Sequence, residues 1–596
     1  MANGGYQDIT PKHAGDDATV RRDLIRRMFS MSAARQPYEA HWAELARYTQ
    51  PRLGSNLNGA RRGKVGSEVN SKLMNDQGIW ASEVMANGMA TGMTSASMPW
   101  FRITTDDPDL RKWQDVKIWL DTVQDRLYGF FARTNFYTAQ KEGYLETGVF
   151  GTGATVMVED PQALGVNWTM TAGDYWIALG ADGVANTLYR RCDMTSAQLL
   201  ERFGADRVSA DARNAYSNQR PSQMFPVYHA IEPNNARLPD TSDNKNMPFR
   251  SIYWQMPGSV DSYGNNVAGN GYDSGASYSL AVNDPPLLEY SGFTEKPFWA
   301  PRWSVKGSET YGRGPSMNAL PTLRSLQIKE LRAQQGADYM IRPSLYGPTA
   351  LNNVHAALIP GGVTTMAGPD KAAFGPIWQV DPKAVELLEA KIERLEQKVD
   401  RAHYANLFMA ITNMPGVQPR NIEEIARRNE EALAQLGPAV DRNHNEQLRI
   451  AIHRAFGIIQ RLGWLPPMPT QLHGQQLRIE FTSILAQMQR AVGLQAIERF
   501  FGFVGSIAGE DPSILDKINR DEAIDEYGDR VGVPARIIVS EADVTKLRNA
   551  RSAQQQAAQA ASIAPAAKDG AAAAKLLAEA QHVSGGNMVG GSTLGA

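Results

Sequence analysis

The chain has one cysteine, Cys192, in 596 residues and almost no net charge. A single cysteine excludes an intrachain disulfide and any zinc site built from several cysteines, and it suits synthesis in a reducing compartment. Lys and Arg number 61 against 63 Asp and Glu, which gives a formal net charge of -2. No overall positive field therefore indicates nucleic-acid binding, and any contact with DNA must be local or made without strong attraction.

Long apolar runs are also missing from the chain. No stretch reaches 18 uncharged apolar residues, and the N-terminal segment MANGGYQDITPKHAGDD lacks the basic start and apolar run of a secretory signal. We therefore expect a protein that does not enter a membrane and is not exported.

Catalytic motifs are absent or incomplete. The nearest approach to a phosphate-binding loop is NGARRGKV at residues 58–65, where Asn58 stands in place of the first glycine. GVFGTG at residues 148–153 has the wrong spacing for a dinucleotide-binding turn and favours the start of a tightly packed strand. No HExxH or GxSxG occurs. The sequence thus predicts no catalytic residue, no cofactor and no enzyme.

Two groups of side chains are candidate metal ligands. His444 and His453 are nine residues apart on one predicted helix, which places them on roughly opposite faces and favours surface or core histidines over ligands. Asp106, Asp107 and Asp109 could bind a cation, but a turn before a capped helix explains them better. We expect no metal site.

The order of predicted elements indicates an α+β fold. Helical patterns come first, followed by short segments rich in Val, Tyr, Trp and Thr, and then by long helices. The early helices are predicted over residues 18–34, 36–51, 71–97 and 115–147. Strands are predicted within residues 151–160, 166–170, 174–191, 226–232 and 249–255, and the β region ends near Ser304. Residues 258–279 favour a long mobile hairpin loop, with a tyrosine-rich interaction surface as the alternative.

The C-terminal half is mainly helical. A helix over residues 316–340 carries leucines that drift around its axis, so more than one face should be in contact. These are Leu320, Leu323, Leu326 and Leu331. After a loop-and-strand module, Asp381 and Pro382 supply an N-cap and a first-turn proline for a helix that can run to about Ala410. A further helix is predicted over residues 421–463, and Pro438 inside it predicts a kink.

The helix after Asp381 has its charges sorted into two flanks. Its apolar residues follow a heptad seam: Val385, Leu388, Ile392, Leu395, Val399 and Ala402. One flank is acidic and comprises Glu386, Glu389, Glu393, Glu396 and Asp400. The other is basic and comprises Lys391, Arg394, Lys398 and Arg401. Like charges three or four residues apart cost roughly 0.2–0.5 kcal/mol per pair in an isolated helix, so the pattern predicts neighbours of opposite charge.

Five segments, taken in order, carry a family resemblance. They are YEAHWAELARYTQPRL (38–53), the small-residue helix ending in MPWFRI (to 103), GTGATVMVED (151–160), ETYGRGPSMNALPTLRSLQ (309–327) and NIEEIARRNEEALAQLGPAV (421–440). None carries chemistry, so each is weak alone, but their order and spacing are specific. The chain resembles the head-to-tail connector, or portal, proteins of short-tailed bacteriophages (podoviruses).

The resemblance implies an elongated α+β subunit with a mixed wing, two long stem helices, a small clip, a long kinked helix and a helical crown. The implied bounds are wing 1–313, first stem helix 314–342, clip 343–381, second stem helix 382–410, tunnel loop 411–420, kinked helix 421–463, crown 464–548, and a low-complexity tail 549–596 that is disordered or helical.

The family's role implies a homo-oligomeric ring, usually a dodecamer, at one capsid vertex, with double-stranded DNA passing through its channel during packaging and ejection. Expected partners are the other subunits, the major capsid and scaffolding proteins, the large subunit of terminase, and tail adaptor or tube proteins. Assembly would take place in the host cytoplasm and the product would be part of the virion. A structural helical scaffold protein of the virion without a DNA channel is the alternative, and an axial channel would decide between them.

Two sets of site residues follow from the resemblance. The tunnel loop would face DNA through Asn413, Met414, Pro415, Gly416, Val417 and Gln418, with a plain interhelix connection as the alternative. The two charged flanks would meet between neighbouring subunits, because a closed ring presents a different side to each neighbour. A solvated surface helix is the alternative to that interface. The low net charge suits a channel that must not trap DNA.

Overall fold

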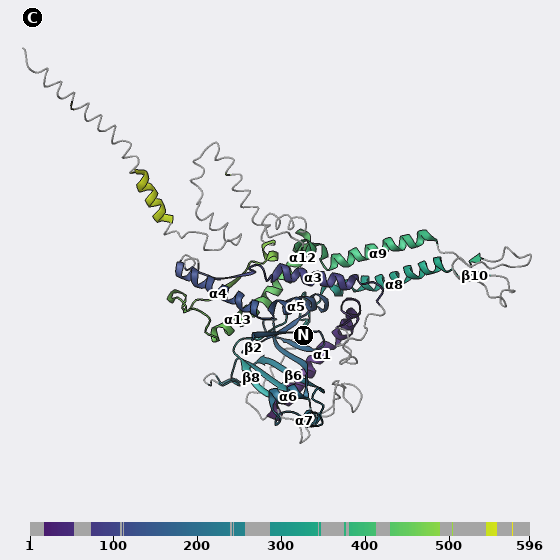
Figure 1. The fold of residues 1–596 in the computed structure, drawn as a ribbon, viewed down its shortest axis with the longest axis horizontal. Coiled ribbons are helices and arrows are strands. Elements are labelled where there is room, and N and C mark those ends of the chain that lie inside the picture. The colour runs from purple at the N-terminus through teal and green to yellow at the C-terminus, as the bar shows by residue number, and fades with distance from the viewer. Residues whose placement is uncertain are drawn as a thin grey trace, which may run out of the picture. The chain divides into compact units, whose positions relative to one another are not determined.

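The computed structural model describes residues 17–52, 73–107, 110, 113–238, 241, 243–256, 287–343, 345–346, 375–376, 381–412, 430–488, 504, 544–556 and 575. They fall into two compact units. The first holds the described parts of residues 1–104, 121–467 and 478–515, and the second holds those of residues 105–120, 468–477 and 516–596. The helices and strands discussed below belong to the first unit, apart from Thr105, residues 114–120, residues 470–472 and Leu477. Figure 1 labels many of these elements.

The N-terminal residues form one helix where two were predicted. Helix α1 (Asp17–Thr49) continues through Pro37, although a proline usually interrupts a helix. Arg35, just before it, is buried and donates hydrogen bonds to the carbonyls of Gly173 and Tyr175, at 3.0 and 2.7 Å. These contacts with a distant segment hold the turn before the proline in place, which favours the continuous helix.

The helix predicted over residues 115–147 is two helices. Between them, the side chain of Asn135 pairs with the backbone of Asn167: its Nδ2 donates to the carbonyl and its Oδ1 accepts from the N–H, each at 2.8 Å. That tertiary contact fixes a break that the local sequence does not require. The elements of this region are α3 (Gln77–Met93), β1 (Phe101–Thr105), α4 (Gln114–Arg133) and α5 (Phe136–Phe150).

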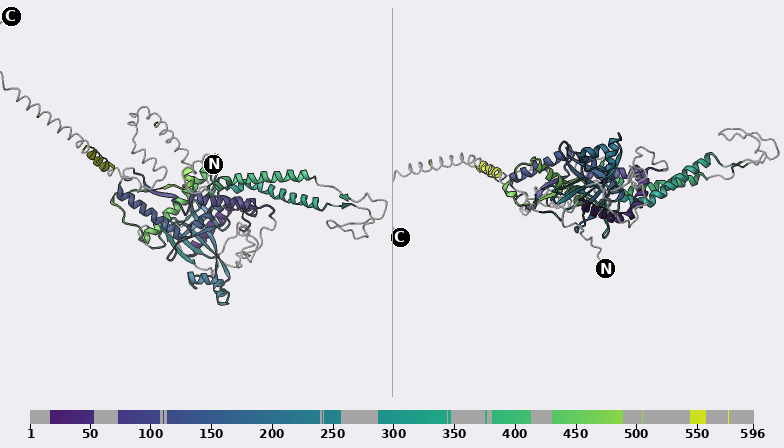
Figure 2. Two further views of the ribbon diagram at one scale, coloured as in Figure 1. Left: turned by 45° about the horizontal axis from the view of Figure 1, so that its top comes forward. Right: turned by 90° about the horizontal axis from the view of Figure 1, so that it is seen from below.

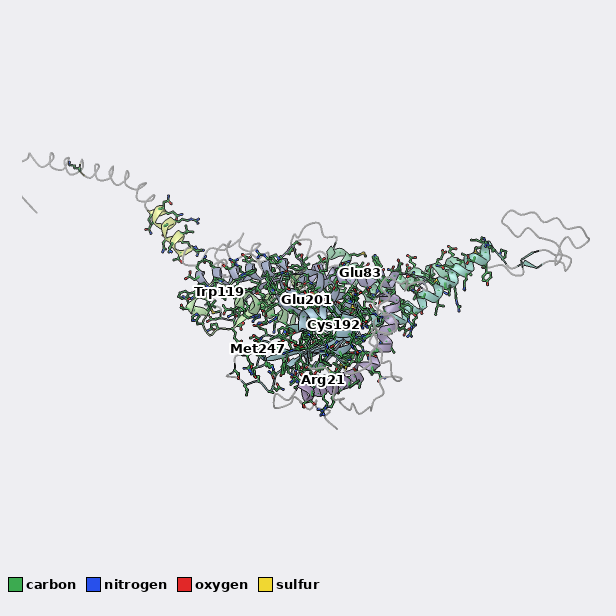
Figure 3. The ribbon with its side chains drawn as sticks, turned by 60° about the horizontal axis from the view of Figure 1, so that its bottom comes forward. Arg21, Glu83, Trp119, Cys192, Glu201 and Met247 are labelled. Atoms are coloured by element: carbon green, nitrogen blue, oxygen red, sulfur yellow. The ribbon has the colours of Figure 1, made fainter. Side chains whose placement is uncertain are left out.

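Two antiparallel sheets make up the β region, with strand orders β3-β2-β9 and β4-β5-β6-β7-β8. Every predicted strand segment is confirmed, whereas α6 (Ser196–Phe203), α7 (Ala210–Ser217), β8 and β9 were not predicted. The strands are β2 (Ala154–Asp160), β3 (Leu164–Met170), β4 (Tyr175–Leu179), β5 (Ala185–Thr195), β6 (Met224–Pro233), β7 (Phe249–Trp254), β8 (Glu289–Phe293) and β9 (Phe298–Trp299). Cys192 lies on β5, inside this region (Figure 3), and burial raises the pKa of its thiol.

Side chains from outside the sheets bind backbone groups on one edge strand of each sheet. Asn135 occupies the outer backbone groups of Asn167 on the edge strand β3. On the edge strand β4, the Tyr311 hydroxyl accepts a hydrogen bond from the N–H of Ile177 at 3.2 Å. Arg35 donates a hydrogen bond to the Tyr175 carbonyl. The backbone groups at these positions are therefore already paired.

Buried charges within the β region are paired inside the chain. Glu232 on β6 receives hydrogen bonds from Arg27 at 2.6 Å, Arg250 at 2.6 Å and the Tyr189 hydroxyl at 3.0 Å. Burial of this carboxylate is tolerable because two guanidinium groups surround it. Glu146 on α5 has no cation beside it among the described residues that bond it: it accepts hydrogen bonds there from the Thr171 hydroxyl and the Ala172 N–H, and burial raises its pKa to about 8.

The C-terminal half contains the predicted long helices, with two differences. The helix after Asp381 does not reach Ala410; it ends at Ala402, and a second helix begins at Ala405. The last long helix contains Pro438, as predicted, and the second difference is one π-helical turn at residues 444–448. The elements are α8 (Pro315–Ile341), β10 (Leu345–Tyr346), β11 (Gly375–Pro376), α9 (Pro382–Ala402), α10 (Ala405–Thr412), α12 (Glu430–Asn443), η3 (His444–Leu448), α13 (Arg449–Arg461) and β12 (Leu477–Phe481), which pairs with β1.

Candidate functional site

Helices α8 and α9 lie side by side and extend away from the sheets (Figures 1 and 2); together they are called the arm. Leu326 and Ala333 of α8 form a buried cluster with Ile392 of α9, flanked by two further heptad residues, Leu388 and Leu395. The predicted apolar seam of α9 is therefore confirmed, and its partner is α8. Strands β10 and β11, between the two helices in sequence, form a short antiparallel pair.

The leucines of α8 contact different surroundings, as their drift around the axis predicted. Leu320 belongs to the large core beneath the sheets, Leu323 packs with Val399 and Ala81, and Leu326 faces the arm seam. Leu331 is 39% exposed and has no such cluster among the described residues. The arm is thus joined to the body at its base and carries apolar surface farther out.

The acidic flank of α9 divides into two parts. Glu396 and Asp400 are half-buried and are hydrogen-bonded within the chain: Asn75 donates to Glu396 at 2.8 Å and Gln77 donates to Asp400 at 2.6 Å. Burial, opposed by the Gln77 hydrogen bond and reinforced by Glu396, raises the pKa of Asp400. The three residues nearer the start of α9 are exposed: Glu386, Glu389 and Glu393.

Gln327 of α8 ties the segment before α3 to the arm. Its Oε1 accepts from the N–H groups of Met74 and Asn75 at 2.8 and 3.1 Å, and its Nε2 donates to the Asn75 carbonyl at 2.7 Å. Asn75 therefore contacts both arm helices at once. No local sequence pattern indicates these contacts, because they join residues more than 250 positions apart.

All four residues of the basic flank are exposed. Among the described residues, none of these cations lies within salt-bridge distance of a carboxylate. They are Lys391, Arg394, Lys398 and Arg401. The outer part of α9 thus presents an acidic side and a basic side that the described part of the chain leaves without opposite charges.

A buried histidine sits where α9 meets the start of α8. His403 Nδ1 lies 2.9 Å from the Val399 carbonyl, and its Nε2 lies 2.8 Å from the Ser316 hydroxyl. Burial, opposed by the Val399 hydrogen bond, lowers the pKa of His403 to about 4, so the ring is neutral at pH 7. A carbonyl can only accept, so Nδ1 donates to it and Nε2 accepts from Ser316. Both side chains are fully buried.

Ion pairs attach the last long helix to the β region. Arg302 donates to Glu446 of the π-helical turn, with its Nη2 at 2.8 Å. On α13, Arg454 lies 2.7 Å from Glu295 and 2.9 Å from Glu159, and Arg461 contacts the same two carboxylates. The chain therefore returns from the arm to the sheets and is fastened there.

The candidate metal ligands do not gather. His444 is buried and stacks on Phe481 with ring centroids 4.1 Å apart, whereas His453 is exposed on α13. Within the described ranges, no three His, Cys, Asp or Glu side chains are arranged to hold a metal ion. None of the described helices has the length and apolar character needed to cross a membrane.

Several predicted features lie outside the described residues. They are the tunnel-loop residues 413–418, the incomplete phosphate-loop segment 58–65, Asp109 and the tyrosine-rich segment 258–279. GVFGTG, in contrast, is described: Gly151 has a φ of 79° and ends α5, and a Cβ there would lie 2.2 Å from the Gly312 carbonyl oxygen. The tight packing expected of this segment is confirmed.

Comparison with known families identifies the chain. The family model for the bacteriophage head to tail connecting protein matches residues 21–266 and 264–539. The chain belongs to this family. The resemblance inferred from the sequence is confirmed, and with it the function of a portal, or head-to-tail connector, of a phage particle.

Two curated relatives extend over nearly the whole connector. It is 34% identical over 571 residues to the portal protein of Salmonella phage epsilon15, covering 94% of this chain and 96% of the relative. It is also 34% identical over 558 residues to the probable portal protein of Bordetella phage BPP-1, covering 93% and 95%. A chain from the solved virion of a native gene transfer agent particle is 12% identical with a TM-score of 0.33. The match covers 79% of this chain and 93% of that one.

Proposed function

We propose that this connector assembles into a closed ring, usually of twelve copies, at one capsid vertex, with double-stranded DNA passing through its axis. The exposed charges of α9 carry the proposal, because the acidic side of one arm and the basic side of the next would be complementary in a head-to-tail ring. Exposed apolar residues on the same helices, such as Ile328 and Leu387, would add contact area between neighbouring arms.

The subdivision implied by the family belongs to the same proposal. Residues 1–313 would be the wing, α8 and α9 the stem helices, residues 343–381 the clip, and residues 464–548 the crown. The major capsid and scaffolding proteins, terminase large subunit and tail proteins are the proposed partners. The ring would assemble in the host cytoplasm.

The proposed interface uses part of the acidic flank and the whole basic flank. Glu396 and Asp400 already bind Asn75 and Gln77, so they offer less charge to a neighbour than the exposed carboxylates do. The proposed pairing is between Glu386, Glu389 and Glu393 of one copy and Lys391, Arg394, Lys398 and Arg401 of the next. Exposed ion pairs contribute only about 0–1 kcal/mol each, so several must act together.

A charge swap tests the interface. Changing Glu386, Glu389 and Glu393 to Lys should weaken ring formation, measured by light scattering and negative-stain electron microscopy at low salt. Adding Lys391→Glu, Arg394→Glu and Lys398→Glu in the same chain should partly restore it. The control converts three equally exposed acids of the wing, Glu201, Asp206 and Asp211, to Lys (Figure 3 labels Glu201).

The outcomes separate the readings. Rings of the wild-type protein with an axial channel wide enough for a duplex support a portal, whereas rods or a monodisperse monomer at micromolar concentration contradict it and favour a helical scaffold. Equal ring formation by the arm variant and the wing control would remove the arm from the interface.

The DNA-facing role of residues 413–418 is a further part of the proposal. It is supported by family membership and by the composition of NMPGVQP, which predicts a turn-rich loop with few large side chains. Variants at Met414 or Gln418 should form normal rings and fail to package or retain DNA. Normal packaging by such variants would leave the segment a plain connection.

A further inference from the structure

The local sequence does not predict the break between α9 and α10. Residues 383–412 contain neither proline nor glycine, and most of them favour a helix. The helix nevertheless ends at Ala402, and Tyr404 adopts a φ of 56° before α10 begins. Residues with a Cβ rarely take this left-handed conformation, and bulky ones least of all. Contacts with other parts of the chain must therefore impose the bend.

The first of these contacts is the buried hydrogen bond between Ser316 and His403. Ser316 donates to Nε2 at 2.8 Å, while Nδ1 of the same ring donates to the Val399 carbonyl, one turn back in α9. The imidazole thus bridges the end of α9 and the first turn of α8. Without the Ser316 hydroxyl, Nε2 would be buried with its hydrogen bond unmade, which is costly.

Ser316 is itself held by a rigid base. A Cβ on Gly314 would lie 2.2 Å from the Gly148 carbonyl oxygen, so the backbone at the start of α8 touches the backbone at the end of α5. Only glycine permits this approach. The His403 contact therefore fixes the end of α9 relative to the start of α8, and through it to α5.

The second contact holds α10 against α3. Leu407 and Phe408 are buried, and a Cβ on Gly88 of α3 would lie only 2.3 Å from the Cβ of Phe408. The Tyr404 ring stacks on Trp303, with centroids 6.5 Å apart and planes at 28°. These contacts favour the bent arrangement and offset the strain at Tyr404.

We propose that His403 and Tyr404 form a two-state joint, in which α9 and α10 are either bent, as seen, or one continuous helix. In the continuous state the N–H groups of Ala405, Asn406 and Leu407 would bond the carbonyls four residues earlier, and α10 would leave the glycine face of α3. A shift of the arm relative to the start of α8 would thereby change how α10 packs on α3. The joint does not rest on the proposed function.

A matched pair of variants at Tyr404 tests the joint. Tyr404→Gly and Tyr404→Ala both remove the ring, but glycine accepts the left-handed conformation freely and disfavours a continuous helix, whereas alanine does the reverse. The ratio of continuous to bent states should therefore be roughly 10- to 30-fold higher in the alanine variant. Ser316→Ala, in the otherwise natural chain, should raise that ratio about 5- to 10-fold over wild type.

The ratio is measurable as a distance within one chain. Nitroxide labels at Ala390→Cys and Asn406→Cys, both exposed positions, are placed in a Cys192→Ala background and diluted with unlabelled chains. Sixteen residues of continuous helix separate the two Cα atoms by about 24 Å, and a bend shortens that distance. Pulsed electron resonance gives the populations, and hydrogen exchange of a peptide spanning residues 403–410 follows the same change without labels.

The expected result is a long-distance population that grows in the order Tyr404→Gly, wild type, Tyr404→Ala, with slower exchange of the peptide amides. Identical short distances in all variants would show a fixed bend and overturn the joint. If Tyr404→Ala is not recovered as soluble protein, the comparison of Ser316→Ala with wild type decides in the same way. If the protein forms rings but the label distance is the same in all variants, only the joint is contradicted. If the protein is a monomer but the label distance changes between variants, only the ring is contradicted.

Discussion

The β region and the arm differ in whether their charged residues are paired within the chain. Glu232 is buried between Arg27 and Arg250, and the charges of these three residues are paired with one another. The outer carboxylates and the basic residues of α9 are exposed, and the described residues supply no opposite charge to them. The difference separates a part of the subunit whose buried charges are paired within the chain from a part whose exposed charges the described residues leave without opposite charges.

The largest effect is expected when a buried charge of the β region is removed. Glu232→Gln takes away the carboxylate that Arg27 and Arg250 share, and breaking a buried pair of this kind costs about 3–5 kcal/mol. Urea unfolding followed by tryptophan fluorescence should show the loss, because Trp254 lies in the same core as Tyr189, which also contacts Glu232. The exposed arm variant Glu389→Gln is the control. Equal urea midpoints for the two variants would show that the buried carboxylate of the β region contributes no more to stability than the exposed carboxylate of the arm.

The second effect, which depends on pH, is expected at Glu146. Because burial raises its folded-state pKa to about 8, above the usual 4.5, its contribution is fully present below pH 4.5 and is lost as pH rises through 8. Wild type should lose up to about 4 kcal/mol of unfolding free energy between pH 4.5 and pH 8.5 from this group. Glu146→Gln, which mimics the protonated form, should flatten that part of the profile. Parallel profiles for variant and wild type would mean that Glu146 is ionised in the folded protein.

The smallest effect is expected for one exposed charge of the arm. Glu389→Lys should leave the unfolding free energy of the subunit unchanged within about 0.5 kcal/mol and weaken ring formation by about 0.2–1 kcal/mol at low salt. Salt near 1 M shortens the screening length to about 3 Å and should remove the difference. Light scattering across a salt series measures this. A defect that persists at high salt would point to lost packing instead of lost charge.

The sequence predicted features of the arm that depend on local periodicity. The heptad spacing of Ile392 and its neighbours identified the buried face of α9, and Asp381 with Pro382 identified its start. These signals lie within a few turns of one helix. The family resemblance drew on the order of such elements, which is why it extended over most of the chain.

The sequence could not predict what distant residues impose. The bend at Tyr404 depends on Ser316 and Trp303, and the inward turn of Glu396 depends on Asn75, 321 positions away. The uninterrupted helix through Pro37 likewise depends on the anchoring of Arg35. In each case a tertiary contact outweighs the preference of the local backbone.

The closed sheet edges restrict how copies of the connector can meet. With the backbone of Asn167 paired to Asn135, and that of Ile177 paired to Tyr311, these positions of β3 and β4 cannot accept the strand of another subunit. Growth by strand addition at these edges, which has no built-in end and leads to fibres, is thereby blocked. In the proposed ring, contacts between side chains would then set the angle from one copy to the next, and a fixed angle is what lets an assembly close on itself after a definite number of copies.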